Sequence, residues 1–214
     1  MATAHAQGDG ALPALLGWQA DDLAQFGSEL VSRSGRDAQA LRALDRLVEL
    51  DDLSSPQALE LIDEIGMSSV QGSGDRFVIG RWVSHGEGYV NDARLDGGVY
   101  FETHPEGYQR LVERFGRGDP RIEQILWRAN QAPIRQAIAD GLPFDYSLAR
   151  MDPQRYVRER NALLLYADGQ VDRALSVLGT GTVPTSLREV ELLLQAGYEP
   201  VFDDVGQVIH WLAP

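Results

Sequence analysis

Apolar residues in the first third of the chain recur every three or four positions, which is the spacing of amphipathic helices. Three segments show this spacing: residues 12–33, 37–50 and 56–65. The third segment begins at the pair Ser55-Pro56 and ends before Gly66, which are typical start and stop signals of a helix. A polar stretch rich in glycine and serine, residues 68–74, follows, and we expect it to be a linker.

Beyond this stretch, short apolar runs typical of buried strands alternate with segments of helical spacing. The predicted strands are residues 77–79, 99–101, 142–148, 201–202 and 208–211. The predicted helices are residues 108–115, 121–130, 134–139, 154–167, 171–178 and 186–196, and a short helix precedes the second strand. Pro133 lacks a backbone donor, so we expect a kink or a restart there. Ser186, with Glu189 three residues later, predicts a capping box.

Strands separated by helices predict an α/β fold, in which a small central sheet is flanked by helices and preceded by a small helical N-terminal module. We therefore divide the chain into residues 1–74, which form the helical module and its linker, and residues 75–214, which form the α/β domain. The apolar stripes of the module are most simply its core, so we expect the chemistry to lie in the second part.

The composition excludes several kinds of chemistry. Cysteine is absent and all 19 basic side chains are arginine, which excludes disulfides, thiolate chemistry, a catalytic lysine and a Walker-type phosphate loop. No run approaches the roughly 18 apolar residues of a membrane helix, and the first residues lack the features of a signal peptide. No ligand spacing among His85, His104, Glu102 and Asp92 supports a zinc site, and we expect neither a metal nor a cofactor.

The net charge of −13 is unevenly distributed. Residues 1–74 carry −8 and residues 161–214 carry −5, whereas residues 75–160 hold equal numbers of acidic side chains and arginines. So acidic a protein is a poor general binder of nucleic acid, but its neutral middle section does not repel an anion, and arginine suits phosphate. An acidic surface that aids solubility and needs no partner is the alternative.

Short motifs in residues 75–214 follow one another in a characteristic order. They are Val78-Ile79-Gly80-Arg81-Trp82, Gly86-Glu87-Gly88-Tyr89, Tyr100-Phe101-Glu102, Trp127-Arg128-Ala129-Asn130-Gln131, residues 141–147, Glu189-Val190-Glu191 with Gly197-Tyr198, and a last strand with Trp211 and Pro214. In this order the chain resembles the C-terminal toxin domains of bacterial polymorphic toxins, which end filamentous-haemagglutinin, contact-dependent-inhibition and Rhs-type proteins.

The resemblance implies a bacterial antagonistic effector. Toxins of this class commonly cleave RNA or DNA, or consume NAD. The resemblance further implies a cognate immunity protein as partner, and delivery into the cytoplasm of a target cell by a larger secretion system.

The candidate site lies in residues 75–103, where two predicted strands hold a glycine-rich segment with many polar and aromatic side chains. Metal-independent RNA cleavage needs a base for the 2′-hydroxyl and an acid for the leaving oxygen, and His85 and His104 beside the strand ends could serve. Arg81 and Arg128 are candidates to stabilise the charge of the phosphorane. The alternative for each histidine is a surface position without a catalytic role.

Glu102 follows the second strand, on the same side as Tyr100 and at the usual ligand edge of an α/β sheet, and is a candidate acid or base. In an NAD glycohydrolase it would instead stabilise the oxocarbenium-like ribose, with Trp82 or Tyr89 stacked on nicotinamide. A structural ion pair of Glu102 with an arginine is equally open. We predict a ribonuclease with Trp82, Tyr89, Tyr100 and Arg128 as substrate contacts. The alternatives are an NAD glycohydrolase and a non-catalytic acidic binding protein of the immunity type.

Overall fold

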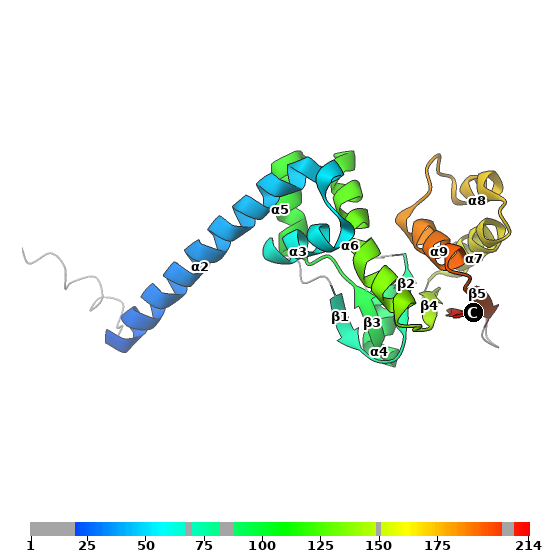
Figure 1. Cartoon of the computed structure of the whole chain (residues 1–214), viewed down its shortest axis with the longest axis horizontal. Coiled ribbons are helices and arrows are strands. Elements are labelled where there is room, and N and C mark those ends of the chain that lie inside the picture. Colours follow the sequence, from blue (N-terminus) through cyan, green and yellow to red (C-terminus); the bar gives the residue numbers. More distant parts are fainter. Residues whose placement is uncertain (1–19, 67–69, 82–87, 149–150, 203–207) are drawn as a thin grey trace, which may run out of the picture.

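The computed structural model describes residues 20–66, 70–81, 88–148, 151–202 and 208–214 (Figure 1). The helices are α2 (Ala20–Arg46), the 3-10 helix η1 (Leu47–Asp52), α3 (Ser55–Glu64), α4 (Tyr89–Asp96), α5 (Pro105–Phe115), α6 (Pro120–Ala139), α7 (Pro153–Ala167), α8 (Val171–Leu178) and α9 (Thr185–Gln195). The strands are β1 (Val70–Ser73), β2 (Phe77–Gly80), β3 (Gly98–Phe101), β4 (Phe144–Ser147), β5 (Glu199–Phe202) and β6 (Val208–Leu212). The predicted α/β class is confirmed, because helices flank a central mixed sheet.

The strands form one sheet in the order β1-β3-β2-β4-β6-β5. β2 pairs in parallel with both β3 and β4, whereas β1, β6 and β5 run antiparallel to their neighbours. The chain passes from β2 to β3 through α4 on one face, and from β3 to β4 through α5 and α6 on the other. Because the two crossovers step in opposite directions on opposite faces, they have the same hand, in accordance with the handedness rule for parallel strands.

Helices α6, α7 and α9 bury one face of the sheet (Figure 1). Every second strand residue points into this core: Phe77, Ile79, Phe144, Tyr146 and Trp211. The alternation follows from the pleat of a strand, which places neighbouring side chains on opposite faces. Full burial of an apolar side chain of this size contributes about 1.5–3 kcal/mol, so this core holds the parallel strands in register.

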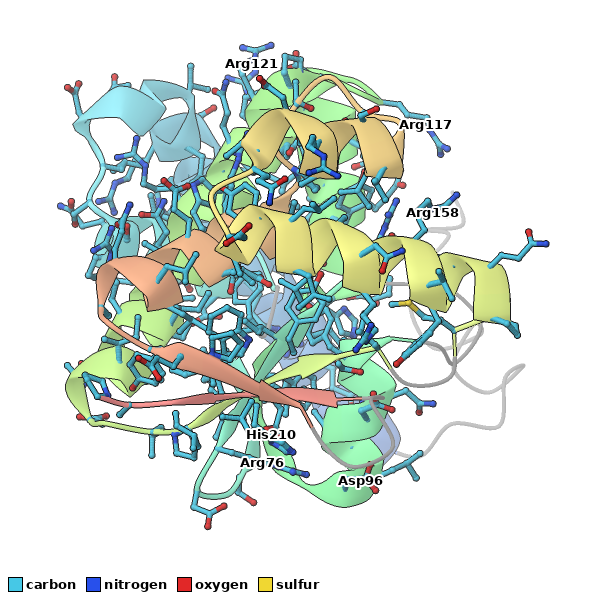
Figure 2. All side chains as sticks on the ribbon, turned by 90° about the vertical axis from the view of Figure 1, so that its right-hand side faces the viewer. Arg76, Asp96, Arg117, Arg121, Arg158 and His210 are labelled. Atoms are coloured by element: carbon cyan, nitrogen blue, oxygen red, sulfur yellow. The ribbon has the colours of Figure 1, made fainter. Side chains whose placement is uncertain are left out.

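The opposite face carries α4 over β2 and β3 and a charged cluster farther along. Asp145 of β4 forms an ion pair with Arg76, in which Oδ2 lies 2.7 Å from Nη1. Its Oδ1 lies 2.6 Å from Nδ1 of His210 on β6. Figure 2 shows Arg76 and His210 on the side of the sheet away from α7. The buried carboxylate of Asp145 thus ties three neighbouring strands together.

The N-terminal helices share an apolar core with α5 and the first half of α6. Fully buried members of this core are Leu61 and Ile62 of α3, Leu111 of α5 and Ile125 of α6. Two arginines add hydrogen bonds: Arg128 Nη1 donates to the carbonyl of Leu53 at 2.8 Å, and Arg110 Nη1 to that of Ile65 at 2.9 Å. The helical module therefore packs directly against helices of the second part, while α2 extends away from it (Figure 1).

Two segments that we predicted as separate helices are not separated: α2 runs from the described part of residues 12–33 through residues 37–46, and residues 47–50 belong to η1. Gly35 lies between the two predicted segments, and one glycine inside a helix costs only about 1 kcal/mol relative to alanine. The prediction of two helices was therefore wrong for this part of the chain.

The restart predicted at Pro133 is also absent, because α6 runs through this residue as one helix. Proline removes one backbone hydrogen bond and crowds the preceding turn, at a cost of about 3 kcal/mol. Pro133 is buried, and so are Ala129, Ile134 and Ala137 around it. Packing on both sides of the proline offsets the lost bond.

The stretch expected to be a linker contains strand β1, which pairs antiparallel with β3. The sequence did not predict this strand, because the glycines in it usually mark a loop. Gly72 has a φ of +79° and lies so close to β3 that a Cβ atom would stand 2.1 Å from the carbonyl oxygen of Gly98. A residue without a side chain is what allows β1 to reach the sheet here.

We expect the substitution Gly72→Ala to lower the free energy of unfolding by roughly 1–3 kcal/mol, because it adds both backbone strain and a clash with β3. Gly35→Ala in α2 is the matched control, since nothing lies within 4 Å of its Cβ position, and it should stabilise slightly. Urea unfolding measures both. Equal stability of the two variants would show that β1 does not pair with β3 as described.

Candidate functional site

The carboxyl end of β2 is the point where the connections of the parallel strands diverge. The chain leaves β2 towards α4 on one face, but it leaves β3 and β4 towards α5 and α7, whose crossovers lie on the other face. Ligands of open α/β sheets bind outside the carboxyl ends of strands at such a switch point. Gly80 and Arg81 lie at this position, and the candidate site is centred on them.

Glu189 of α9 reaches the end of β2 from the helical face. Its Oε1 accepts a hydrogen bond from Nδ2 of Asn130 at 2.5 Å, and its Oε2 accepts one from the backbone N–H of Gly80 at 3.3 Å. Burial raises the pKa of Glu189 from 4.5 to about 8, while the bonds from Asn130 and Gly80 work in the opposite direction. At neutral pH this carboxyl group is therefore mostly protonated and can give up a proton.

Gly80 permits this approach because it has no side chain. Its φ is +140°, and a Cβ atom would stand 3.0 Å from the carbonyl oxygen of Ser147 and 3.4 Å from Cβ of Tyr89. The strand therefore ends in a tightly enclosed backbone N–H that faces the carboxyl group of Glu189. Asn130 is 5% exposed, and its Oδ1 has no hydrogen-bond partner among the described residues, so an acceptor stands beside Glu189.

Tyr146 of β4 lies between two carboxyl groups. Burial raises the pKa of its phenol well above the ordinary value, Glu159 and Glu189 raise it further, and the hydrogen bond with Ser186 and the charge of Arg81 oppose them. All four groups are therefore close to the ring. A phenol that stays protonated can donate or accept a hydrogen bond but cannot act as a base.

Glu159 of α7 pairs with Arg81, directly after β2. The carboxylate is only 3% exposed, whereas the arginine side chain is 43% exposed. A guanidinium has five N–H donors, and one carboxylate contact leaves several of them available. The pair therefore sets a buried carboxylate beside a solvent-accessible cation at the same strand end.

Tyr89 and Ser147 continue the polar group on the α4 side. The hydroxyl of Tyr89 donates to the carbonyl of Phe101 at the end of β3, and the hydroxyl of Ser147 hydrogen-bonds to Asp92 of α4. Burial raises the pKa of Tyr89 far above its ordinary value, and Glu189 and Glu102 add to the shift. Polar side chains of α4, α6, α7 and α9 thus converge on the carboxyl ends of β2, β3 and β4.

Among the residues predicted from the sequence, three lie at this edge. Arg81 and Tyr89 belong to the cluster just described, and Glu102 is near enough to Tyr89 to influence its pKa. The carboxylate of Glu102 forms an ion pair with Arg94 at 2.6 Å, and Nε of Arg94 donates to the hydroxyl of Tyr100. Glu102 and Tyr100 therefore share an arginine on the α4 side of the sheet.

The other predicted residues lie elsewhere or outside the described ranges. Nδ1 of His104 accepts the backbone N–H of Glu106, so this ring caps α5. Arg128 holds the N-terminal helices through the carbonyl of Leu53. His85 and Trp82 lie outside the described residues, and their predicted roles stay predictions.

Sequence reasoning missed the buried acids because it took polar residues in helices for caps or surface positions. The predicted capping box of Ser186 and Glu189 was wrong: α9 is capped at Pro184, and both side chains are buried. A signal was present, because Glu189 lies beside Val190 and four residues before Leu193, which places it on the apolar stripe. Glu159 likewise precedes buried Ala162, Leu163 and Tyr166 at helical spacing.

The side chains at the site are suited to proton transfer and anion binding. Across the described ranges, no three His, Asp or Glu side chains are grouped so that they could hold a metal ion. Nor does any described helix combine the length and apolar character needed to cross a membrane. Glu189 keeps its proton near neutral pH, whereas Glu159 is paired with an arginine. Acid–base catalysis uses two carboxyl groups in such different environments.

The raised pKa of Glu189 makes stability depend on pH. Between about pH 4.5 and pH 8 the folded state keeps a proton that the unfolded chain has lost, so the free energy of unfolding falls as the pH rises, by up to about 1.4 kcal/mol per pH unit. In Glu189→Gln this component is absent. We expect the wild-type protein to lose stability relative to this variant from pH 5 to pH 8, as measured by urea unfolding.

Glu191→Gln is the control, because this glutamate is exposed on the same helix, and it should behave like the wild type. Parallel pH profiles for the wild type and Glu189→Gln would contradict the buried, protonated carboxyl group.

Comparisons of the chain with protein-family models, with curated proteins and with solved structures found no match.

Proposed function

We propose that this chain is the catalytic part of a bacterial antagonistic toxin and that it cleaves RNA without a metal ion. The observation that carries the proposal is Glu189, a buried carboxyl group with a pKa of about 8 at the carboxyl end of β2. Strongly shifted carboxyl groups at such positions are typical of general acids. The toxin class comes from the motif order of the sequence.

The proposed reaction uses three side chains of the site. The carboxylate of Glu159 takes the proton of a ribose 2′-hydroxyl, whose oxygen attacks the neighbouring phosphorus. The guanidinium of Arg81 stabilises the added negative charge on the phosphorane oxygens. Glu189 then gives its proton to the departing 5′-oxygen, which leaves a 2′,3′-cyclic phosphate and a free 5′-hydroxyl. His85, which we predicted as an acid or a base, is the alternative proton acceptor.

An NAD glycohydrolase is the second candidate, and the charge of the protein favours it. The chain carries a net charge of −13, and the site holds several acids close to one arginine. Long polyanions are repelled by such a charge, whereas a dinucleotide presents only two phosphates. In that reaction an ionised carboxylate stabilises the ribosyl cation as nicotinamide leaves.

Delivery and inhibition belong to the same proposal. A toxin of this class enters the cytoplasm of a target cell through a larger secretion system and is neutralised by a cognate immunity protein. Expression of the chain in bacteria without a partner should then stop growth and cleave tRNA. Depleted NAD with intact tRNA would favour the second candidate. Unaffected growth with both pools intact would favour the non-catalytic binding protein.

Purified Glu189→Gln should cleave RNA at least about 100-fold more slowly than the wild type, because general acid catalysis contributes 10²–10⁴-fold. Gln can still accept the hydrogen bond from Gly80, so the fold should be retained. Glu191→Gln, on the exposed side of the same helix, should keep wild-type activity. Release of acid-soluble nucleotides from tRNA measures the rates. Equal rates for the wild type and Glu189→Gln would refute the role of Glu189.

The rate of the wild-type enzyme should fall above about pH 8, since Glu189 must be protonated to act as the acid. The decline should approach tenfold per pH unit well above this pKa. The residual activity of Glu189→Gln should not show this decline. A wild-type rate that keeps rising to pH 10 would show that the acid is another group.

A further inference from the structure

Arg155 of α7 carries a donor that nothing in the described part of the chain satisfies. Its Nε–H is buried and has no hydrogen-bond partner there, and no ion pair of this guanidinium occurs among the described residues. Buried polar groups are almost always hydrogen-bonded, so this donor calls for an acceptor from beyond the described residues, such as a ligand. Guanidinium groups bind carboxylates and phosphates with two parallel N–H donors.

The position of Arg155 relates this donor to the site. Arg155 and Glu159 are four residues apart on α7, so their side chains lie on the same face of the helix, about 5–6 Å apart at Cβ. Arg81 pairs with the same Glu159 from the end of β2. Arg155 and Arg81 are thus both neighbours of Glu159, the first one turn away along α7 and the second through an ion pair.

Arg158 shows the contrast on the same helix. It is exposed and lies on the side of α7 away from the sheet (Figure 2). Arg155 is half-buried and its Nε is enclosed. An arginine that serves only solubility keeps its guanidinium in water, whereas one that binds a ligand is held in place by its surroundings.

We propose that Arg155 and Arg81 together hold a phosphate group of the substrate, with Glu159 between them and Glu189 beside it. The subsite deepens the proposed function and rests on it, because it assumes that Glu189 marks the reacting bond. The ligand chemistry is a nucleotide phosphate, which RNA offers as a phosphodiester and NAD as a pyrophosphate. A carboxylate ligand fits less well, since Glu159 already competes with it for Arg81.

Binding of a short 2′-O-methyl RNA oligonucleotide tests the subsite without cleavage, because this probe has no nucleophilic 2′-hydroxyl. We expect Arg155→Gln to weaken its binding at least about tenfold and to reduce the slope of log affinity against log salt by about 0.7, the value for one phosphate of a single strand. Arg158→Gln removes the same charge from the same helix and should change affinity less than about threefold. Titration calorimetry at several salt concentrations measures both.

Equal effects of the two substitutions would overturn the proposal. ADP-ribose in a second arm identifies the source of the phosphate: a loss confined to the oligonucleotide indicates RNA, and a loss confined to ADP-ribose indicates the dinucleotide. If Arg155→Gln does not fold, Arg155→Lys replaces it. Lysine keeps the charge but not the paired donors, so affinity should fall while the salt slope stays, and wild-type affinity would overturn the subsite.

The outcome separates this proposal from the proposed function. Glu189→Gln should slow cleavage at least about 100-fold and leave oligonucleotide affinity within about threefold, whereas Arg155→Gln should act first on affinity and KM. If no RNA or NAD is consumed but binding still depends on Arg155, the subsite stands and the proposed function fails. If cleavage depends on Glu189 while Arg155→Gln binds like the wild type, the reverse holds.

Discussion

The constraint that organises this protein is a carboxyl group enclosed at the end of a parallel strand, with no cationic partner among the described residues. Burial of an ionised carboxylate is costly unless it is paired, so Glu189 remains protonated near neutral pH. Its two hydrogen bonds come from the amide of Asn130 and the backbone of Gly80, neither of which carries a charge. A cationic side chain in place of Asn130 would favour the ionised form of the acid and remove its distinctive property.

The order of the strands explains why this group lies at the edge of the sheet where α/β proteins usually bind their ligands. β2 lies between β3 and β4, and the crossovers that leave β2 and β3 lie on opposite faces of the sheet, so the carboxyl end of β2 is a switch point. Helices α7 and α9 come from the second half of the chain and supply the acids from one face. Helix α4 supplies Tyr89 and Asp92 from the other face. The chemistry at this edge is therefore assembled from segments far apart in the sequence.

Because the site combines segments that are far apart in the sequence, only part of it could be predicted from the sequence. The α/β class, the two strands around the glycine-rich segment, and α8 were predicted from periodicity alone, since apolar spacing reports local structure directly. Arg81 and Tyr89 were found because they lie in the segment between two predicted strands. Glu159, Tyr146 and Glu189 were missed, because periodicity does not tell which distant helix faces which strand. An acid on an apolar stripe was the available signal, and it resembled a helix cap.

Helix α6 connects the N-terminal helices to the site. Its first half packs into the core that includes α2 and α3, and its second half packs under the sheet. Asn130 lies between these halves, two residues after Arg128, which is fixed to the carbonyl of Leu53. Pro133 follows one turn later inside the same buried stretch, so the helix is held on both sides of Asn130. Because the amide of Asn130 must stay within hydrogen-bond distance of Glu189, packing of the N-terminal helices on α6 bears on the protonation of the acid. The helical module therefore has a physical role at the site, although none of its described residues lies there.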